Sequence, residues 1–525
     1  MIILGIGGLL NDATCAILKD GELVAAVEQE KVARRFQPAE LPADAIAECL
    51  RIAGVGAGEV DCVAVVRPYT QGPEGALHLQ LRDWFPRSEV VLVEHHVAHA
   101  ASAYYASPFD QATVLTLDRN GDFRCAARWK ASGTQLVLDK ELYHPDSLGE
   151  LYGRVTDLLG YEPNADEHKV QWLSTSGDDR FHGLFLEVLS GRNGAWPRID
   201  RSFFHGERKS RGGFSAKFYK RLGVGDGEAI PEALKASVAA GLQHAIETAV
   251  IEMAGEGENL CLAGGLALNV LLVAALERSG RWNRVFVQPA AGNAGTALGA
   301  VLHAWHQVLH ETERVPLTGL CLGPSFTAED IKQVLENCKL NFRYLLTTGE
   351  IIETAVREIH DQKIVAWMHG RMEFGPRALG NRSILASPLN PYSTENLNIY
   401  IKRREPFRKF AASVPEEAVG KYFEVGPNAR YLATVGRVRP EHKKLFESAI
   451  LGDGLVRVHT VSRQDNPLFW DLLQATGKAT GLPVLYNTSF NLFGDPLVCT
   501  PRDAVRSFYS SGIDALFAGN FFLTK

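Results

Sequence analysis

Short apolar runs separated by polar turns open the chain. Residues 1–6 form an apolar run that leads into the polar loop 7–12, and the apolar segments 13–18 and 23–28 follow around a Lys-Asp-Gly turn. Apolar segments of this length, bounded by Gly, Asn and Asp, predict β-strands joined by tight turns. We therefore expect the chain to begin with a strand, a polar loop and a hairpin.

The same design returns further along the chain. Residues 112–118 are largely apolar up to Asp118, the loop 119–122 is polar, and residues 123–129 resume a strand-like pattern. Two similar units of strand, acidic loop and strand predict two related lobes. An opening of this kind is typical of nucleotide-binding lobes of the actin, Hsp70 and sugar-kinase type, so we expect an α/β, two-lobed N-terminal part.

Helical and strand patterns alternate through the rest of the chain. Apolar residues recur at helical spacing over residues 233–254, and apolar strands at 259–263 and 285–288 each run into a glycine-containing loop. Further on the pattern changes, and a second α/β section extends to the end. Because 525 residues exceed what one hydrophobic core usually serves, the length predicts two or three domains. The change of pattern divides the chain into the predicted domains 1–345 and 346–525.

The bulk composition is that of an ordinary globular protein. The chain is 46% hydrophobic and 22% charged, and its net charge of −6 offers no electrostatic reason to bind nucleic acid or an anionic membrane. No apolar run approaches the roughly 20 residues of a membrane helix, and residues 1–6 lack the basic flank of a signal peptide. The scattered cysteines form no C-x-x-C pair, which argues against a zinc ribbon or a disulfide framework. A cytoplasmic location is the expectation.

Residues 371–383 concentrate anion-binding chemistry. This short segment holds Arg371, Arg377 and Arg382, and a Gly-Pro pair inside it forbids a continuous helix. Guanidinium groups match phosphate and carboxylate geometry with two parallel hydrogen bonds, which favours an anion site. The alternative is a loop held together by structural salt bridges.

Two further polar groups follow. Residues 402–409 carry five positive charges, and Pro406 among apolar neighbours disfavours a plain exposed helix, the usual setting of such a run. Residues 482–486 form an apolar strand that ends in the polar sequence Asn-Thr-Ser-Phe-Asn at 487–491. Sheets of α/β proteins bind ligands at such strand ends. With the arginines, these groups predict a pocket for an anionic, phosphate-bearing substrate and ATP.

Two histidines form a candidate metal site. His95 and His99 lie four residues apart, which places them on one face of a helix, and neutral imidazoles are good ligands of zinc and iron. His96 points away from that face. Asp118, at the end of a strand, is the best-placed third ligand. Core or helix-capping histidines are the alternative.

Glycine loops follow two predicted strands. Gly264 and Gly265 end one strand, and Gly292 and Gly295 lie in the loop after the next. Glycine lets backbone N–H groups and helix N-termini approach a nucleotide phosphate closely. Because turns commonly need glycine for their own geometry, structural turns are the alternative.

Taken together, these segments resemble the O-carbamoyltransferase family of the nodulation-factor, cephamycin and tobramycin type. The matching motifs occur in family order over nearly the whole chain, at residues 95–100, 147–149, 167–170, 260–269, 288–299, 371–383, 401–413 and 484–491. The resemblance implies a Kae1-like, two-lobed N-terminal domain and a YrdC-like, α/β C-terminal domain.

The resemblance also implies a two-step reaction. The C-terminal domain would join carbamoyl phosphate and ATP, with Mg²⁺, into carbamoyl adenylate, and release phosphate and pyrophosphate. The intermediate would pass internally to the N-terminal domain, sheltered from water, where an acceptor takes the carbamoyl group. Matched residue by residue, the anion site comprises Arg377, Lys402, Arg408 and Ser489.

Matched positions supply the remaining roles. Those implied to bind nucleotide or phosphate, including two arginines that support the anion site, are Gly264, Gly265, Asn269, Gly292, Gly295, Arg371, Arg382 and Asn487. His95, His99 and Asp118 would hold Fe²⁺ or Zn²⁺. Asn11 and Asp12 occupy the loop that handles the acceptor's proton.

Four segments depart from the family pattern, all in the N-terminal domain. Asn11 stands where the family has a histidine that can take a proton, and Asn293 stands where it has a metal-binding aspartate. Arg119 adds a positive charge beside the predicted metal, and Trp172 adds a bulky ring near the acceptor site. Because an amide binds metal without supplying charge, we expect a lower metal affinity.

These departures leave three hypotheses for the function. The first is a working carbamoyltransferase with an altered small-molecule acceptor, such as a natural-product hydroxyl or amine, for which Asp12 or the substrate itself manages the proton. The second is an enzyme that forms the adenylate and uses it in another reaction. The third is a non-catalytic or subunit-dependent homologue that binds nucleotide. Nucleic acid and membranes are not expected partners, and a homodimer is an assembly that the sequence allows.

Overall fold

The computed structural model describes residues 1–35, 38, 40–67, 75–190, 196–205, 211–314 and 316–525. The chain divides into two compact units. The first comprises residues 1–93, 293–450 and 454–525, and the second comprises residues 94–292 with 451–453. The domain boundary predicted at residue 345 falls inside the first unit and stays a prediction.

A five-stranded sheet carries the N-terminal end of the first unit. Its order is β3 (Glu22–Glu28), β2 (Thr14–Lys19), β1 (Ile2–Gly7), β4 (Cys62–Val66) and β5 (Glu89–Val93). Strands β1 to β3 form an antiparallel meander, and β4 and β5 run parallel to β1. The strand, loop and hairpin predicted for residues 1–28 are therefore confirmed.

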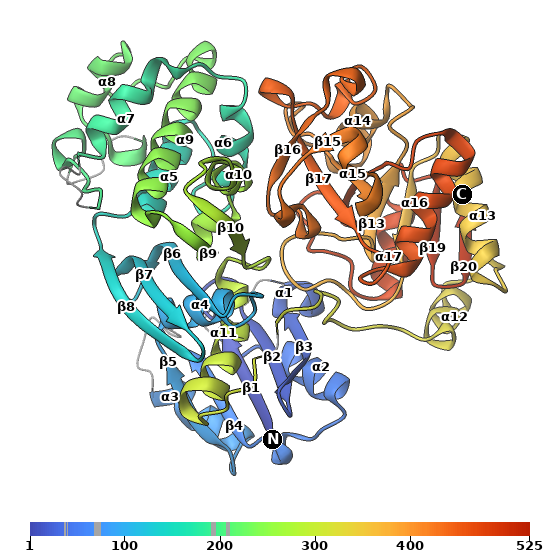
Figure 1. Cartoon of the computed structure of the whole chain (residues 1–525). Coiled ribbons are helices and arrows are strands. Elements are labelled where there is room, and N and C mark those ends of the chain that lie inside the picture. Colours follow the sequence, from blue (N-terminus) through green and yellow to red (C-terminus); the bar gives the residue numbers. More distant parts are fainter. Residues whose placement is uncertain (36–37, 39, 68–74, 191–195, 206–210, 315) are drawn as a thin grey trace. The chain divides into compact units, whose positions relative to one another are not determined.

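Helices from distant parts of the chain cover this sheet. α2 (Ala43–Ala53) packs against β2 and β3, whereas α11 (Thr296–His303) packs against β1, β2 and β4 (Figure 1). The short helix α1 (Gln29–Ala33) follows β3, and α3 (Gly75–Trp84) lies between β4 and β5 in the chain.

The second unit repeats the sheet of the first. Its order is β10 (Trp282–Val287), β9 (Gly257–Ala263), β6 (Gln111–Gly121), β7 (Arg124–Ser132) and β8 (Gln135–Tyr143). Its first strand in sequence is again central, with an antiparallel meander on one side and two parallel strands on the other. Two sheets of the same topology confirm the predicted pair of related lobes.

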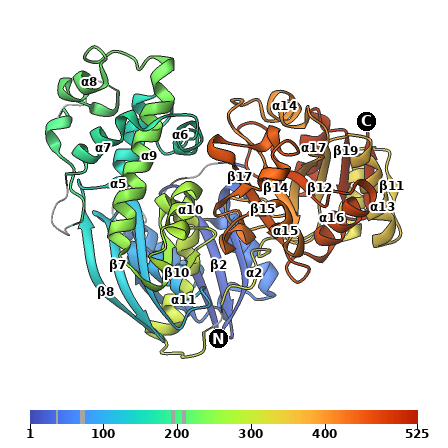
Figure 2. The ribbon, with the colours of Figure 1, turned by 45° about the horizontal axis from the view of Figure 1, so that its top comes forward.

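A long helix organises the helical part of the second unit. α9 (Glu232–Ala254) confirms the helix predicted over 233–254 (Figure 2). It packs along α5 (Leu148–Leu158), α6 (Glu167–Ser174), α7 (His182–Val188) and α10 (Val270–Arg278). α4 (His95–Tyr104) packs on β6, β7 and β9, and α8 (Ala216–Leu222) precedes α9 in the chain.

Ten strands form the sheet of the C-terminal half. Their order is β11 (Arg343–Tyr344), β20 (Phe521–Thr524), β19 (Ala515–Ala518), β12 (Val365–Met368), β13 (Arg382–Ala386), β18 (Leu485–Ser489), β14 (Ala411–Pro415), β17 (Leu455–Val461), β16 (Val435–Val438) and β15 (Phe423–Glu424). Neighbours are antiparallel except for the pairs β12–β19 and β14–β17, which are parallel.

Apolar cores cover both faces of this sheet. Along β12, Ala366 and Met368 face one core while Val365 and Trp367 face the other, as strand alternation requires. α13 (Thr348–His360) packs against α16 (Pro467–Thr480), α12 (Ala328–Asn337) packs against α17 (Pro501–Tyr509), and α15 (Glu416–Tyr422) packs on β14 and β17. The short helix α14 (Ser393–Asn396) precedes Lys402. A YrdC-like identity of this half stays a prediction.

Among the described residues, no helix is both long and apolar enough to cross a bilayer.

Candidate anion and metal sites

Residues 371–381 form an irregular loop between β12 and β13, as the Gly-Pro pair predicts. The loop folds around the buried carboxylate of Glu373, whose Oε1 accepts the backbone N–H groups of Leu379, Asn381 and Arg382 at 2.9, 2.7 and 3.1 Å. Gly380 has a φ of +99°, and a Cβ there would lie 2.3 Å from the ring of Phe469. Only glycine therefore fits this bend.

Sheet register places several polar segments at one edge. Ala411 of β14 pairs with Asn487 of β18 and with Arg457 of β17, while Ser383 of β13 pairs with Ser489. The starts of β13, β14 and β17 therefore meet the end of β18. Five basic side chains belong to this edge, namely Arg377, Lys402, Arg404, Arg408 and Arg457. We call these five the cationic cluster.

Burial and mutual repulsion lower the pKa values of Arg377, Lys402, Arg404 and Arg457. Burial, together with the nearby Arg408, lowers the pKa of Arg377. The pKa of Lys402 falls well below its ordinary value, first because of burial and then because of Arg404 and Arg408. The pKa of Arg457 is also lowered well below its ordinary value, by burial and by the other arginines. Cations that disfavour one another's charge in this way are stabilised by a bound anion.

Lys402 stabilises the polar turn after β18 through hydrogen bonds. Its Nζ donates to the carbonyl of Ser489 at 2.6 Å, to the carbonyl of Asn491 at 2.9 Å and to Asn491 Oδ1 at 2.6 Å. Ser489 Oγ donates to the same Oδ1 at 2.8 Å. The structure thus brings together Arg377, Lys402, Arg408 and Ser489, the residues that the sequence assigns to the anion site.

Two residues of this edge were missing from the sequence-based assignment. Arg457 is the one arginine of the largely apolar strand β17, and its pairing with Ala411 brings it to the site. Asn491 lies within the polar sequence 487–491, two residues after Ser489. That spacing was the sequence feature that could have indicated its place in the site. Strand register was needed to recognise the first, whereas the motif itself contained the second.

Arg371 and Arg382 meet backbone carbonyls instead of the cationic cluster. The Arg371 guanidinium donates to the carbonyls of Gly323, Val24 and Leu322 at 3.0, 2.8 and 2.6 Å. Arg382, 1% exposed, donates from Nη1 to the carbonyls of His369, Gly370 and Asn381 at 2.8 to 3.2 Å. These are structural clamps, and the anion-binding role predicted for the two arginines gains no support from them. Hydrogen bonds to carbonyls, in place of the salt bridges of the structural alternative, hold these two arginines, and the anion-site role of Arg377 stays a prediction.

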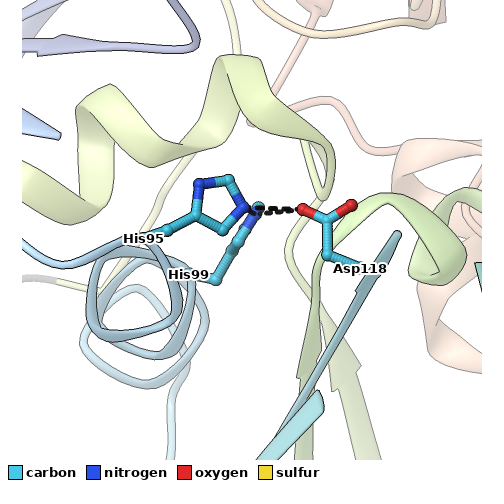
Figure 3. A group of neighbouring side chains, drawn as sticks. All are labelled: His95, His99 and Asp118. Atoms are coloured by element: carbon cyan, nitrogen blue, oxygen red, sulfur yellow. Dashed lines mark hydrogen bonds and ion pairs between the residues drawn. The ribbon is translucent and has the colours of Figure 1, made fainter. Parts of the chain in front are cut away.

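His95, His99 and Asp118 converge in the second unit (Figure 3). Asp118 Oδ2 lies 2.7 Å from His95 Nε2 and 3.1 Å from His99 Nε2, and the two nitrogens are 3.1 Å apart. Burial opposes the charge of Asp118, but hydrogen bonds from the two imidazoles hold its pKa well below the ordinary value. Burial lowers the pKa of His99, against the hydrogen bond to Asp118, which favours the uncharged imidazole that binds metals.

Neighbouring residues set the geometry of this triad. The backbone N–H of Arg119 donates to Asp118 Oδ1 at 2.7 Å, which leaves Oδ2 directed at the histidines. A Cβ on Gly121 would lie 2.1 Å from His95 Cδ2, so this position needs glycine. Arg119 turns its side chain to Glu150 Oε2 at 2.6 Å, so the positive charge predicted beside the metal is paired.

The triad fits a cation bound through nitrogen and oxygen. Ligand atoms about 2.0–2.2 Å from a metal and at right angles to one another lie about 3 Å apart. The observed separations of 2.7 to 3.1 Å match that value. Two histidines and one carboxylate are a ligand set of iron and zinc sites. His96 contacts Thr116 Oγ1 at 2.8 Å and the carbonyl of Arg124 at 3.0 Å, which agrees with its predicted place outside the ligand set.

Close packing surrounds the glycines of the loop before α10 and Gly292 of the loop after β10. A Cβ on Gly264 would lie 2.1 Å from the carbonyl oxygen of Leu117, and φ at this glycine is +98°. A Cβ on Gly265 would approach Asp118 Oδ1 to 3.1 Å, and one on Gly292 would approach Leu268 Cδ1 to 3.2 Å. Close packing therefore accounts for these glycines.

The first N–H groups of α10 meet the protein's own side chains. Asn269 Oδ1 accepts the N–H groups of Leu271 and Leu272 at 3.2 and 3.1 Å. Gln171, in the amide orientation that satisfies its neighbours, accepts the N–H of Val270 at 2.9 Å. This helix start is capped from within, and the nucleotide-binding role of Gly264, Gly265, Asn269 and Gly292 stays a prediction.

The remaining predicted residues lie on two adjoining loops of the first unit. Asn11 and Asp12 are exposed in the loop between β1 and β2. A Cβ on Gly8 would lie 2.3 Å from the carbonyl oxygen of Asp12 and 3.2 Å from that of Asn293. Asn293 and Gly295 precede α11, so two of the family departures, Asn11 and Asn293, occur on neighbouring loops. The metal-binding role of Asn293 stays a prediction.

Comparison with known proteins matches both halves of the chain. Residues 75–302 match the model of the carbamoyltransferase N-terminus, and residues 356–525 match that of the carbamoyltransferase C-terminus. An uncharacterised protein of Synechocystis is 33% identical over 100% of this chain and 96% of its own length. Nodulation protein NolNO of Sinorhizobium fredii is 33% identical over 98% of this chain and 79% of its own length. Component A of the (R)-2-hydroxyglutaryl-CoA dehydratase of Acidaminococcus fermentans has a TM-score of 0.38 and 18% identity over 59% of this chain and 99% of that one.

Proposed function

The chain is an enzyme of the carbamoyltransferase family, and on that premise we propose that it activates carbamoyl phosphate with ATP and transfers the carbamoyl group to a small-molecule acceptor. The observation that carries the proposal is the cationic cluster beside the Lys402–Ser489 turn. Like charges buried together favour a multiply charged anion, and both proposed substrates carry phosphate.

The first half-reaction is proposed for the edge of the C-terminal sheet. Water cleaves carbamoyl phosphate to carbamate and phosphate, a carbamate oxygen then attacks the α-phosphorus of ATP, and the bond to pyrophosphate breaks. Arg377 and Arg457 neutralise the phosphate charge in this step. Lys402 holds the Ser489 turn in place through its contacts with Ser489 and Asn491.

The second half-reaction is proposed for the N-terminal part of the chain. The acceptor's oxygen or nitrogen attacks the carbamoyl carbon, the bond from that carbon to the adenylate oxygen breaks, and AMP leaves. Asp12, or a basic group of the acceptor substrate itself, takes the proton that the acceptor loses. His95, His99 and Asp118 would hold Fe²⁺ or Zn²⁺, a Lewis acid that polarises a carbonyl.

Pyrophosphate release tests the first half-reaction, and mass spectrometry tests the second. The protein, Mg²⁺, ATP and carbamoyl phosphate should release pyrophosphate only when all are present. Candidate hydroxyl and amine metabolites should then gain the mass of one carbamoyl group. Folded protein that releases no pyrophosphate contradicts the activation step, and pyrophosphate release without any carbamoylated product in a broad screen would indicate another use of the adenylate.

A further inference from the structure

A buried hydrogen-bond acceptor lies beside the cationic cluster. Asn487 is 2% exposed, and among the described residues its Oδ1 has no hydrogen-bond partner. Burying such an oxygen without a partner destabilises a fold, so an unsatisfied acceptor in this position points to a missing donor. Asn487 lies two residues before Ser489 on β18, and side chains at that spacing share one face of a strand.

The neighbours of Asn487 determine which end of its amide faces the site. Nδ2 donates to the carbonyl of Ala378 at 3.4 Å and to Ser413 Oγ at 3.1 Å. A carbonyl oxygen only accepts, so the amide nitrogen must lie on that side. Ser413 Oγ also contacts His459 Nδ1 at 2.9 Å, and burial lowers the pKa of His459 to about 3, so this imidazole is neutral near pH 7.

These contacts form a chain across three adjacent strands. Asn487 lies on β18, Ser413 on β14 and His459 on β17, and Ser413 pairs directly with His459 in the sheet register. Ser413 accepts a hydrogen bond from Asn487 Nδ2, and its own hydroxyl hydrogen can then be donated to His459 Nδ1. Oδ1 of Asn487 is thereby held in one orientation.

The substrate supplies the donor that this oxygen lacks. Side chains of the cationic cluster only donate, which suits the phosphate end of carbamoyl phosphate. The other end of that molecule is an amide whose –NH₂ group only donates hydrogen bonds at physiological pH. An amide oxygen repels phosphate oxygens and attracts this –NH₂ group.

We infer that Asn487 Oδ1 accepts a hydrogen bond from the carbamoyl –NH₂ group and selects carbamoyl phosphate over acyl phosphates. This inference rests on the proposed function. It gives Asn487 a role in recognising the carbamoyl group in place of the phosphate contact that the sequence suggests. An acetyl phosphate would place a methyl group against the same oxygen and leave it unpaired.

Binding of three phosphates to the intact protein tests the inference. Carbamoyl phosphate, acetyl phosphate and inorganic phosphate are titrated calorimetrically into wild type and Asn487→Leu, an exchange of similar volume that removes the amide. We expect Asn487→Leu to weaken carbamoyl phosphate by about 10- to 100-fold, because the buried –NH₂ group loses its acceptor. The affinities for acetyl phosphate and inorganic phosphate should stay within about threefold.

A second variant separates recognition from structural damage. Ser413→Ala leaves the Asn487 oxygen in place but removes one of the contacts that orient it, so carbamoyl phosphate alone should weaken, by about 10-fold or less. Equal losses for all three phosphates in both variants, or no loss in either, would overturn the inference. If wild type binds carbamoyl phosphate no better than inorganic phosphate and releases no pyrophosphate, the proposed function itself fails, which is a distinct result.

Discussion

Arg371, Arg377 and Arg382 share one short segment, yet their guanidinium groups meet different partners. Arg371 and Arg382 donate to backbone carbonyls, whereas burial, and then the nearby Arg408, lower the pKa of Arg377. A carbonyl is a fixed partner of the folded chain, whereas a bound anion would stabilise buried cations that repel one another. Substitutions of these arginines should therefore separate stability from activity.

Replacing Arg377 should remove activity without unfolding the protein. Arg377→Ala takes away one positive charge at the phosphate site, and we expect carbamoyl-phosphate-dependent pyrophosphate release to fall by about 100- to 1,000-fold. The melting temperature should stay the same or rise, because repulsion within the cationic cluster decreases. Pyrophosphate release and a thermal melt measure the two effects. Full pyrophosphate release by the variant would place the phosphate site elsewhere.

Arg371→Ala is the matched control for that experiment. It removes three charge-assisted hydrogen bonds to carbonyls, so the free energy of unfolding should fall by about 2–4 kcal/mol. The remaining folded fraction should keep most of its affinity for inorganic phosphate. A loss of phosphate binding as large as that of Arg377→Ala would show that Arg371 contacts the anion directly.

If the histidine triad holds a metal ion, metal binding should depend on His95, His99 and Asp118. His99→Ala and Asp118→Asn should each abolish binding of the Fe²⁺ or Zn²⁺ that wild type retains after gel filtration. Gly121→Ala should weaken that binding by about 10- to 100-fold, because its Cβ would displace the His95 ring. His96→Gln, which alters a neighbour outside the triad, should keep the metal. Elemental analysis of the purified proteins decides, and equal metal content in all variants would contradict the site.

Residue type alone does not show which of these side chains belong to a candidate site. The histidine spacing and the strand end at Asp118 are local features, so the sequence predicts the triad correctly as a group. Arg457 is one basic residue in an apolar strand, and nothing in its neighbourhood marks it. Its place beside the anion site depends on a strand pairing between residues far apart in sequence, which local patterns do not encode.

Lys31 of helix α1 and Glu28 of β3 hold the loop 371–381 against the N-terminal sheet. We call this contact the clamp. Lys31 Nζ contacts Glu28 Oε1 at 2.8 Å and donates to the carbonyls of Gly375 and Glu373 at 2.6 and 3.2 Å. The N–H of Gly375 donates to Glu28 Oε1 at 2.8 Å. Both charged side chains are only 11% exposed, so this ion pair lies in a region of low dielectric. The clamp holds the backbone two residues before Arg377.

Breaking the clamp should weaken both the fold and substrate binding. Lys31→Met removes the ammonium and leaves the Glu28 carboxylate buried without its counter-ion, so the free energy of unfolding should fall by about 3–5 kcal/mol. A loosened loop should also raise the KM for carbamoyl phosphate more than it lowers kcat. Denaturant unfolding and steady-state pyrophosphate release measure these changes.

The double variant Lys31→Met/Glu28→Gln controls for the lost charge. Glutamine is uncharged and still accepts the N–H of Gly375, so most of the lost stability should return. If the double variant is no more stable than Lys31→Met, then the buried charge is not the source of the defect. An unchanged KM in Lys31→Met would show that the clamp does not position Arg377.

The existence of strands and helices could be predicted from the sequence more readily than the partners against which they pack. The apolar runs within residues 1–28 and 112–129 predict the strands and hairpins because each is bounded by turn residues. β11 and α12 precede residue 346, yet β11 pairs with β20 and α12 packs against α17, and their sequences carry no sign of these partners. The glycine loop before α10 matches a phosphate-binding pattern locally, yet Asn269 and Gln171 cap the helix.

The molecule combines two kinds of site that serve different steps of the proposed reaction. The cationic cluster belongs to the first unit and the histidine triad to the second. A phosphate-binding site suits formation of the adenylate, and a cation-binding site suits transfer of the carbamoyl group. Carbamoyl adenylate reacts with water, so the two steps must be connected without prolonged exposure to solvent.

Substitutions in the two sites should therefore block different steps. His99→Ala should release pyrophosphate from ATP and carbamoyl phosphate within about threefold of wild type but lose transfer to the acceptor by about 100-fold or more, because only the second step uses the triad. Arg377→Ala should lose both signals, since no adenylate forms. An equal mixture of the two variants should regain little transfer, because adenylate made by one chain meets water before it reaches another. Loss of pyrophosphate release in His99→Ala would contradict the division of steps, and strong recovery of transfer in the mixture would show that the adenylate is released into solution.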